Sequence, residues 1–162
     1  MKVLTLGDPL LYKQSALVGD FDQGIRDFSQ AMFEVMHREK GIGLAAVQVG
    51  QLIRLFVTHV PQDMPRVFIN PEITETSLAE TEYEEGCLSI PGVNADVIRP
   101  ESVKVQAWDE RGKVFSLAAD GLLARTIQHE IDHLNGKLFI DRINPKKRSR
   151  LLKHYKGQKL PA

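Results

Sequence analysis

Apolar residues recur at helical spacing in one segment near the beginning of the chain, DQGIRDFSQAMFEVMHREKG at positions 22–41. Residues three or four positions apart share one face of a helix, so this spacing predicts an amphipathic helix with a core-facing side. Gly41 or Gly43 could end it, because glycine readily adopts the left-handed conformation that follows many helices. The apolar stripe consists of Ile25, Phe28, Met32, Val35 and Met36.

Short apolar segments with strand composition follow, at residues 52–60, 66–74, 96–108 and 113–119. A second helix is predicted for GLLARTIQHEIDHLNG, with Asp120 as its N-cap and Gly136 just past its end, and a third helix after Pro145. This order predicts an α+β fold. Antiparallel strands would surround a central helix that carries H-E-x-x-H, with an amphipathic helix before them and a basic helix at the C-terminal end.

The composition is that of one globular domain spanning residues 1–162, with 43% hydrophobic and 26% charged residues. The formal net charge of +0 argues against binding to nucleic acid or membranes through overall charge. We see no signal peptide and no apolar run long enough to span a membrane. The single cysteine, Cys87, excludes an intrachain disulfide and suits a reducing compartment, so we expect a cytoplasmic protein.

Positive charge is concentrated in residues 143–162, which contain no acidic residue. This basic tail is either a solvated terminus or a surface that contacts RNA or an acidic partner, and the sequence leaves both interpretations open. Its basic residues are Lys146, Lys147, Arg148, Arg150, Lys153, Lys156 and Lys159.

The segment QHEIDHLNG contains the pattern H-E-x-x-H. On a helix, His129 and His133 would lie one turn apart on the same face and could bind one metal ion, with Glu130 beside them as a general base. The pattern would occur by chance somewhere in this chain with odds on the order of one per cent. In that case the two histidines would be ordinary residues that are solvated or hydrogen-bonded in the core. A catalytic metal site normally has three protein ligands, so a third must come from elsewhere in the chain.

The third ligand is best supplied from upstream. A third histidine in the longer H-E-x-x-H-x-x-G-x-x-H pattern would fall on Phe139, and no glutamate follows Glu130. Asp141 and His154 are the conventional ligands downstream, and both are poorly placed. Cys87 within EEGCLSIPG offers a thiolate that suits zinc, iron or nickel, although a lone cysteine is more often a buried structural residue. The predicted ligand set is Cys87, His129 and His133.

The segment GIGLAAVQVG has small residues that allow another chain segment to lie close beside it, and one long polar side chain, Gln48. Gln48 is interpreted either as an amide donor aimed at a developing oxyanion or as a surface residue at a packing corner.

Together, GIGLAAVQVG, EGCLS and QHEIDH resemble the three motifs of peptide deformylases, in the same order and with similar spacing. The similarity continues through IRPESVKVQAWDERGK and DGLLARTIQHEIDHLNGKLFIDRI and covers nearly the whole chain. That family removes the N-formyl group from formylmethionine in nascent polypeptides. Val47 stands where the family often has Pro, and Asn94 where it often has Arg. Neither departure alters the predicted chemistry.

The resemblance implies that a metal ion held by the predicted ligands activates water for attack on the formyl carbon. Glu130 would carry a proton from the water to the leaving amine, while Gln48 and the backbone N–H of Leu88 would stabilise the oxyanion. Free peptide and formate would result.

The implied substrate is an extended formylmethionyl peptide. Gly43 and Gly86 would lie beside its backbone. Ile42, Leu122 and Arg125 would line the methionine pocket, Arg125 through its aliphatic stem, although Leu122 could equally be an ordinary core residue.

The resemblance also implies one divalent cation, with Fe²⁺ as the native ion and Zn²⁺, Ni²⁺ or Co²⁺ able to replace it; the ligands alone would indicate zinc. Because nascent chains emerge from ribosomes, a transient ribosome contact through the basic tail is expected, without membrane binding or a stable nucleic-acid complex. We expect a monomer. Asp132 could pair with Arg99 or be solvated.

Three other functions were weighed: a peptidase of the H-E-x-x-H type, a binding protein on the same fold, and a metal store. A peptide without the formyl group would distinguish the peptidase. The presence of Gln48, Glu130 and all three ligands argues against the other two.

Overall fold

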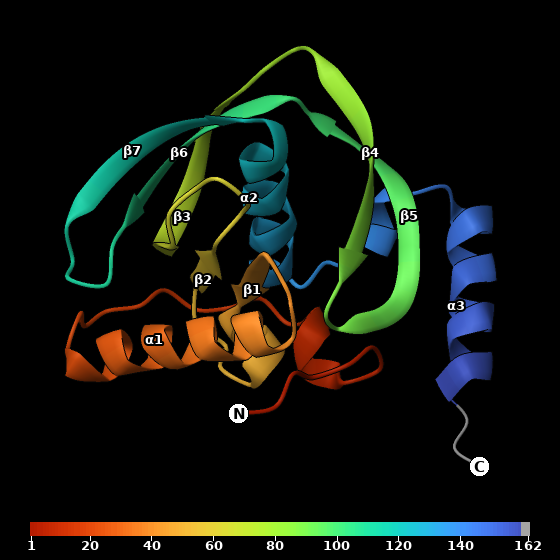
Figure 1. Cartoon of the computed structure of the whole chain (residues 1–162), viewed down its shortest axis with the longest axis horizontal. Coiled ribbons are helices and arrows are strands. Elements are labelled where there is room, and N and C mark those ends of the chain that lie inside the picture. The colour runs from red at the N-terminus through yellow and green to blue at the C-terminus, as the bar shows by residue number, and fades with distance from the viewer. Residues whose placement is uncertain (160–162) are drawn as a thin grey trace.

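The computed structural model describes the backbone of residues 1–159 and the side chains of residues 1–155. Within residues 1–159, three α-helices and seven strands form the fold, together with short 3-10 helices (Figure 1). The helices are α1 (Gln23–Arg38), α2 (Gly121–Leu134) and α3 (Pro145–Lys159). The strands are β1 (Gly43–Ala45), β2 (Leu55–Thr58), β3 (Arg66–Thr76), β4 (Glu80–Cys87), β5 (Ile90–Pro100), β6 (Ser102–Trp108) and β7 (Val114–Asp120). The 3-10 helices are η1 (Pro9–Tyr12), η2 (Ala46–Val49) and η3 (Phe139–Arg142).

The strands form two antiparallel sheets. One has the order β1-β2-β3-β6-β7, and the other is the hairpin of β4 and β5. Helix α2 lies between the larger sheet and the hairpin (Figure 1). The antiparallel sheets and the three helices agree with the predicted α+β class.

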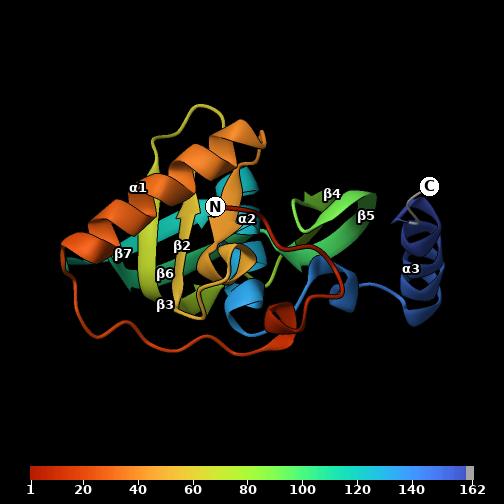
Figure 2. The same cartoon turned by 90° about the horizontal axis from the view of Figure 1, so that it is seen from below.

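The larger sheet is covered on both faces. Phe56 and Phe68 stack at 4.6 Å between ring centroids and pack in a cluster with Ile127 of α2. The alternate residues of β2, Leu55 and Val57, pack in a second cluster that includes the apolar face of α1, which crosses the sheet in Figure 2. Burial on both sides explains why β2 reads as a continuous apolar run.

Helix α1 begins where Asp22 accepts a hydrogen bond from the backbone N–H of Ile25, at 3.1 Å. Its last residue is Arg38, and the left-handed conformation after it belongs to Lys40, with φ of 59°. The expectation that a glycine takes this conformation was therefore wrong. Gly43 already lies in β1, and Gly41 directly follows Lys40 and donates a backbone hydrogen bond to Met36 at 2.9 Å.

Helix α2 follows Asp120, whose side chain makes no cap hydrogen bond. Beyond its end, Gly136 has φ of 74°, and a Cβ atom there would lie 2.7 Å from the carbonyl oxygen of Tyr12. Glycine is thus required by both conformation and space.

Several strand boundaries differ from the predicted segments. Residues 96–108 belong to two strands, β5 and β6, because the chain turns at Glu101. Strands β1 and β4 were not predicted, since β1 is short and β4 is rich in glutamate.

Helix α3 packs against β5 through Leu151, Leu152 and Tyr155 (Figures 1 and 2). The tail is therefore docked as far as Tyr155, while the side chains of Lys156 and Lys159 lie outside the described residues. No described helix combines the length and apolarity needed to cross a membrane.

Candidate active site

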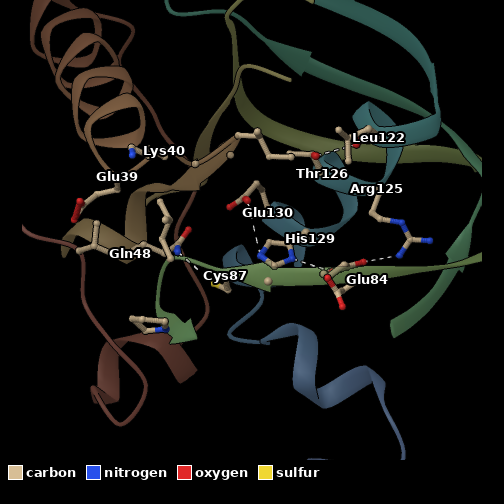
Figure 3. A pocket seen from close by; sticks show the side chains of 18 of the residues that line it. Glu39, Lys40, Gln48, Glu84, Cys87, Leu122, Arg125, Thr126, His129 and Glu130 are labelled. Carbon is tan, nitrogen blue, oxygen red and sulfur yellow. Dashed lines mark hydrogen bonds and ion pairs between the residues drawn. The ribbon is translucent and has the colours of Figure 1, made fainter. Parts of the chain in front are cut away.

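A cleft of about 640 Å³ is bordered by β1, the β4–β5 hairpin and α2. Every residue predicted from the sequence to take part in catalysis or binding lines this cleft, except His133, which is fully buried. Figure 3 shows Gln48, Cys87, His129 and Glu130 around a common space. The lining residues of the predicted set are Ile42, Gly43, Gln48, Gly86, Cys87, Leu88, Leu122, Arg125, His129 and Glu130.

The three predicted metal ligands come together from two elements. Cys87 is the last residue of β4, and His129 and His133 lie one turn apart on α2. Their ligand atoms are all within 4.8 Å of one another, and Cys87 Sγ lies 3.3 Å from His133 Nε2. Ligand atoms around one tetrahedral ion would be about 3.5 Å apart, so these donors fit a borderline divalent cation.

The pKa values of the two imidazoles are shifted in opposite directions. Burial lowers the pKa of His133 well below its ordinary value, which favours the neutral ring that a metal ion requires. Burial also opposes charge on His129, but hydrogen bonds with Cys87 and Glu85 outweigh it and raise the pKa of His129 well above its ordinary value. A bound cation would compete with that proton for the ring nitrogen.

Glu85 holds His129 in place. Its Oε1 lies 3.0 Å from His129 Nδ1, and its two oxygens accept from Arg99 Nε at 2.6 Å and Nη2 at 3.0 Å. Burial alone would raise the pKa of Glu85, but the hydrogen bonds from His129 and Arg99 lower it to about 2. Glu85 is therefore a carboxylate that orients a candidate metal-ligand histidine, a common arrangement around protein-bound metals.

Asp132 continues this buried network. Its carboxylate lies 3.0 Å from Arg99 Nη1 and 2.6 Å from Arg142 Nη2. The sequence left open whether Asp132 pairs with Arg99 or is solvated, and the structure pairs it with both arginines. Its contacts with Arg142 join α2 to η3.

Glu130 is 3% exposed, and its Oε2 lies 4.0 Å from His129 Nε2. Its Oε1 has no hydrogen-bond partner among the described residues. Burial is the main cause that raises the pKa of Glu130 to about 7, where a carboxyl group can both accept and donate a proton near neutral pH. Gly43 makes room for this group, because a Cβ atom there would lie 2.6 Å from Glu130 Oε2.

Gln48 is held by three partners. Its Oε1 accepts from the backbone N–H of Ala45 at 2.9 Å, which fixes the orientation of the amide. Its Nε2 donates to Ser89 Oγ at 3.0 Å and lies 3.6 Å from Cys87 Sγ. The weaker sulfur contact leaves one N–H directed toward the candidate metal ligands.

Two glycines permit close packing at the rim. A Cβ atom on Gly86 would lie 2.5 Å from Oδ1 of Asn94, the residue paired with it across the hairpin. A Cβ atom on Gly41 would lie 2.7 Å from Cδ1 of Leu88. Asn94 therefore packs directly beside Gly86, which lines the cleft.

Arg125 contributes to the cleft wall while its guanidinium is bound elsewhere. Nη1 donates to Glu85 Oε2 at 2.6 Å and to the carbonyl of Val97 at 2.9 Å, and Nη2 donates to the carbonyl of Thr81 at 2.8 Å. The guanidinium also lies over the ring of Tyr83 at 5.6 Å. These contacts leave the aliphatic stem for the cleft, where Ile42 and Leu122 are about one-third exposed.

The sequence interpretation missed Glu85, Arg99 and Ser89 as parts of the site. Glu85 and Ser89 flank Cys87 within the motif EEGCLS, so their proximity to the ligand was available as a signal. Arg99 is twelve residues beyond Cys87 and carried no local signal; only the pairing of β4 with β5 brings it to Glu85.

The sequence model of the polypeptide deformylase family matches residues 1–149 of the chain. A peptide deformylase of Treponema pallidum is 49% identical over 155 residues, covering 96% of this chain and 95% of the relative. One of Brucella suis is 47% identical over 158 residues, covering 95% and 90%.

Solved structures agree with these relatives. The peptide deformylase of Ehrlichia chaffeensis in complex with actinonin matches with a TM-score of 0.95 and 38% identity, over 99% of this chain and 98% of the other. A peptide deformylase from Synechococcus elongatus in complex with actinonin gives a TM-score of 0.92 and 44% identity, over 97% and 88%.

Proposed function

The chain belongs to the polypeptide deformylase family, and from that premise we propose how its cleft carries out the family reaction. The enzyme hydrolyses the N-formyl group of formylmethionine at the start of nascent polypeptides and releases formate. The observation that carries this conclusion is the convergence of one cysteine, two histidines and a buried glutamate at the cleft of a chain that matches the family over residues 1–149.

Cys87, His129 and His133 would hold one divalent cation. When bound, it supplies Lewis-acid activation of water and of the formyl oxygen. Glu85 is hydrogen-bonded to Nδ1 of His129, so the Nε2 lone pair would be free to bind the cation. Ferrous iron is proposed as the native ion on the strength of the family resemblance, since thiolate and imidazole donors also suit zinc, nickel and cobalt.

Glu130 is proposed as the general base and acid. It takes a proton from the water that adds to the formyl carbon, and it gives that proton to the α-amino nitrogen as the C–N bond breaks. A pKa of about 7 suits both tasks at neutral pH, and the Oε1 atom, which has no hydrogen-bond partner among the described side chains, is available for the water.

Gln48 and the backbone N–H of Leu88 are proposed to donate hydrogen bonds to the oxyanion that develops on the formyl oxygen. The Gln48 amide is already oriented by Ala45 and Ser89, so little reorganisation is needed in the transition state. The donor would be the N–H that now contacts the sulfur of Cys87.

The peptide is proposed to bind in extended form between Gly43 and Gly86, where the absence of side chains lets its backbone approach both strands. Its methionine side chain would contact Ile42, Leu122 and the stem of Arg125. All three contribute apolar surface to the cleft.

The test is formate release from a formylmethionyl tripeptide by anaerobically purified protein loaded with iron or nickel. The same peptide without its formyl group serves as the control for backbone cleavage. Formate release with an intact peptide backbone is expected. Cleavage of the unformylated peptide would instead favour the peptidase, and absence of formate with one bound metal equivalent would contradict the proposed reaction.

We further propose that α3 contacts ribosomal RNA transiently, because the substrate emerges from the ribosome. Apolar contacts hold one side of α3 on β5, whereas the side chains of Lys146, Lys147, Arg150 and Lys153 are exposed. Such a surface would bind phosphates in a salt-dependent manner.

Charge reversal tests this contact without removing the packing residues of α3. Replacing Lys146, Lys147, Arg150 and Lys153 with Glu should abolish salt-sensitive sedimentation with ribosomes. Reversal of two exposed lysines on the larger sheet and its turn, Lys104 and Lys113, is a control with half that change in charge and should leave the sedimentation unchanged. Equal sedimentation of both variants would contradict the ribosome contact.

A further inference from the structure

Two histidines outside the active site meet at the molecular surface. His37 lies in the last turn of α1, and His59 directly follows β2. His37 Nε2 and His59 Nδ1 are 2.9 Å apart, and the two rings are nearly perpendicular, with an interplanar angle of 69°. The two nitrogens therefore face each other, and one donates a hydrogen bond to the other.

Neighbouring residues contact the ring of His37 and the backbone of His59. His37 stacks on Phe33, one turn earlier in α1, with 6.2 Å between centroids. The backbone N–H of His59 donates to the carbonyl oxygen of Ile42 at 2.9 Å. Asp63, which is paired with Arg66, also interacts with His59: its pKa is lowered mainly by the hydrogen bond from Arg66 and to a smaller extent by His59.

We propose that His37 and His59 form a second metal site, which binds one divalent transition-metal ion of the class that imidazole prefers, such as Zn²⁺, Ni²⁺ or Cu²⁺. An ion with metal–nitrogen distances of about 2.0–2.1 Å in a tetrahedral site requires its two nitrogens to be about 3.4 Å apart. The pair would have to open by only about 0.5 Å, and water would fill the remaining positions. Because His37 is at the end of a helix and solvent-exposed, a small rotation of its side chain can supply this opening.

The site differs from the catalytic centre in its donors and its exposure. It has two imidazoles and no thiolate, so its affinities should follow the order Cu²⁺ above Ni²⁺ and Zn²⁺. It is nevertheless connected to the cleft, since His59 binds the backbone of Ile42 and the next residue, Gly43, packs against Glu130. An ion at the pair would join the end of α1 to the strand that borders the substrate cleft.

Calorimetric titration of zinc-loaded protein with Zn²⁺ tests the site, because zinc exchange at an already occupied catalytic centre produces no net heat. One further equivalent of Zn²⁺ is expected in the unmodified protein. His37→Gln and His59→Gln should each weaken this binding at least tenfold, while both variants keep one tightly bound zinc and their rate of formate release. His154→Gln, at an exposed histidine of α3, is the matched control and should retain the further equivalent.

Imidazole resonances in nitrogen-15 spectra of the same zinc-loaded protein provide the second readout. The signals of His37 and His59 should shift together and saturate at one added equivalent, with His154 unchanged. Absence of a further equivalent, equal binding by the two glutamine variants, or a parallel shift of His154 would overturn the proposal.

Discussion

Glu85 Oε1 lies 3.0 Å from Nδ1 of His129, and this contact joins the candidate metal centre to a buried ionic network. The same carboxylate accepts from Arg99 and Arg125, so one side chain orients a ligand while it compensates two cations. Because the pKa of Glu85 is lowered to about 2, it remains ionised at neutral pH. The neutral His129 that binds metal would then carry its proton on Nδ1 and present Nε2 to the ion.

Glu85→Gln should weaken metal binding by roughly 10–100-fold, because the acceptor that fixes His129 is lost. It should also lower the free energy of unfolding by about 3–5 kcal/mol, since buried Arg125 loses its charged partner and buried Arg99 keeps only Asp132. Competition with a chelator measures the first effect, and denaturant unfolding the second. Glu84→Gln, at the exposed neighbour, is the control and should change neither. Equal effects of the two variants would contradict the assigned role of Glu85.

Glu130→Gln should lower kcat by about 10²–10⁴-fold without loss of bound metal, because the amide cannot transfer a proton. Formate release and elemental analysis of the same sample measure these two quantities. Glutamine has nearly the same shape as glutamate, so its side chain should fit in the same space beside Gly43. A kcat within threefold of the unmodified enzyme would exclude Glu130 as the proton carrier.

Local patterns predicted α1, α2 and two of the three candidate metal ligands, because spacing within a helix is a short-range property. The spacing of His129, Glu130 and His133 needed only the periodicity of α2, and the buried positions of Met32, Val35 and Met36 only that of α1. The end of α1 was missed because Lys40, and no glycine, takes the left-handed conformation there.

Features that depend on the pairing of two strands could not be predicted from local sequence patterns. Strand β4 has three exposed glutamates, Glu80, Glu82 and Glu84, and it is a strand because it pairs with β5. The same pairing places Arg99 beside Glu85. The partner of Gln48 was missed for a similar reason, since Ser89 reaches it only through the turn after β4.

Gln48→Leu should lower kcat by about 10²–10³-fold, the usual effect of removing one oxyanion donor. Ser89→Ala leaves the amide in place but removes the acceptor at 3.0 Å, so its effect on kcat should be smaller. Steady-state formate release by both variants tests this ranking. A larger loss in Ser89→Ala would mean that orientation of Gln48, rather than its donor, limits the reaction.

Arg125→Lys should raise KM for a formylmethionyl peptide more than it lowers kcat. Lysine keeps an aliphatic stem, but it cannot contact Glu85, Val97 and Thr81 at once as the planar guanidinium does. The cleft wall should therefore loosen, while Glu130 and the metal ligands retain their places. The change in KM is measured for a formylmethionyl and a formylalanyl peptide, and the difference between them reports the contact of the cleft wall with the methionine side chain. An equal change in KM for both would place the role of Arg125 away from the methionine side chain.

Removal or oxidation of the metal centre should abolish formate release. Protein whose metal has been removed by a chelator should regain activity when Fe²⁺, Ni²⁺ or Co²⁺ is added at one ion per chain. One ion is expected because Cys87, His129 and His133 form one compact donor set. Peroxide should inactivate the iron-loaded enzyme through oxidation of Fe²⁺ or of the Cys87 thiolate. Peroxide treatment of nickel-loaded enzyme distinguishes these two targets. If it is inactivated more slowly than the iron-loaded enzyme, the iron is the oxidised group; if both are inactivated at the same rate, Cys87 is. Full activity of the iron-loaded enzyme after peroxide treatment would argue against iron and an essential thiolate at this site.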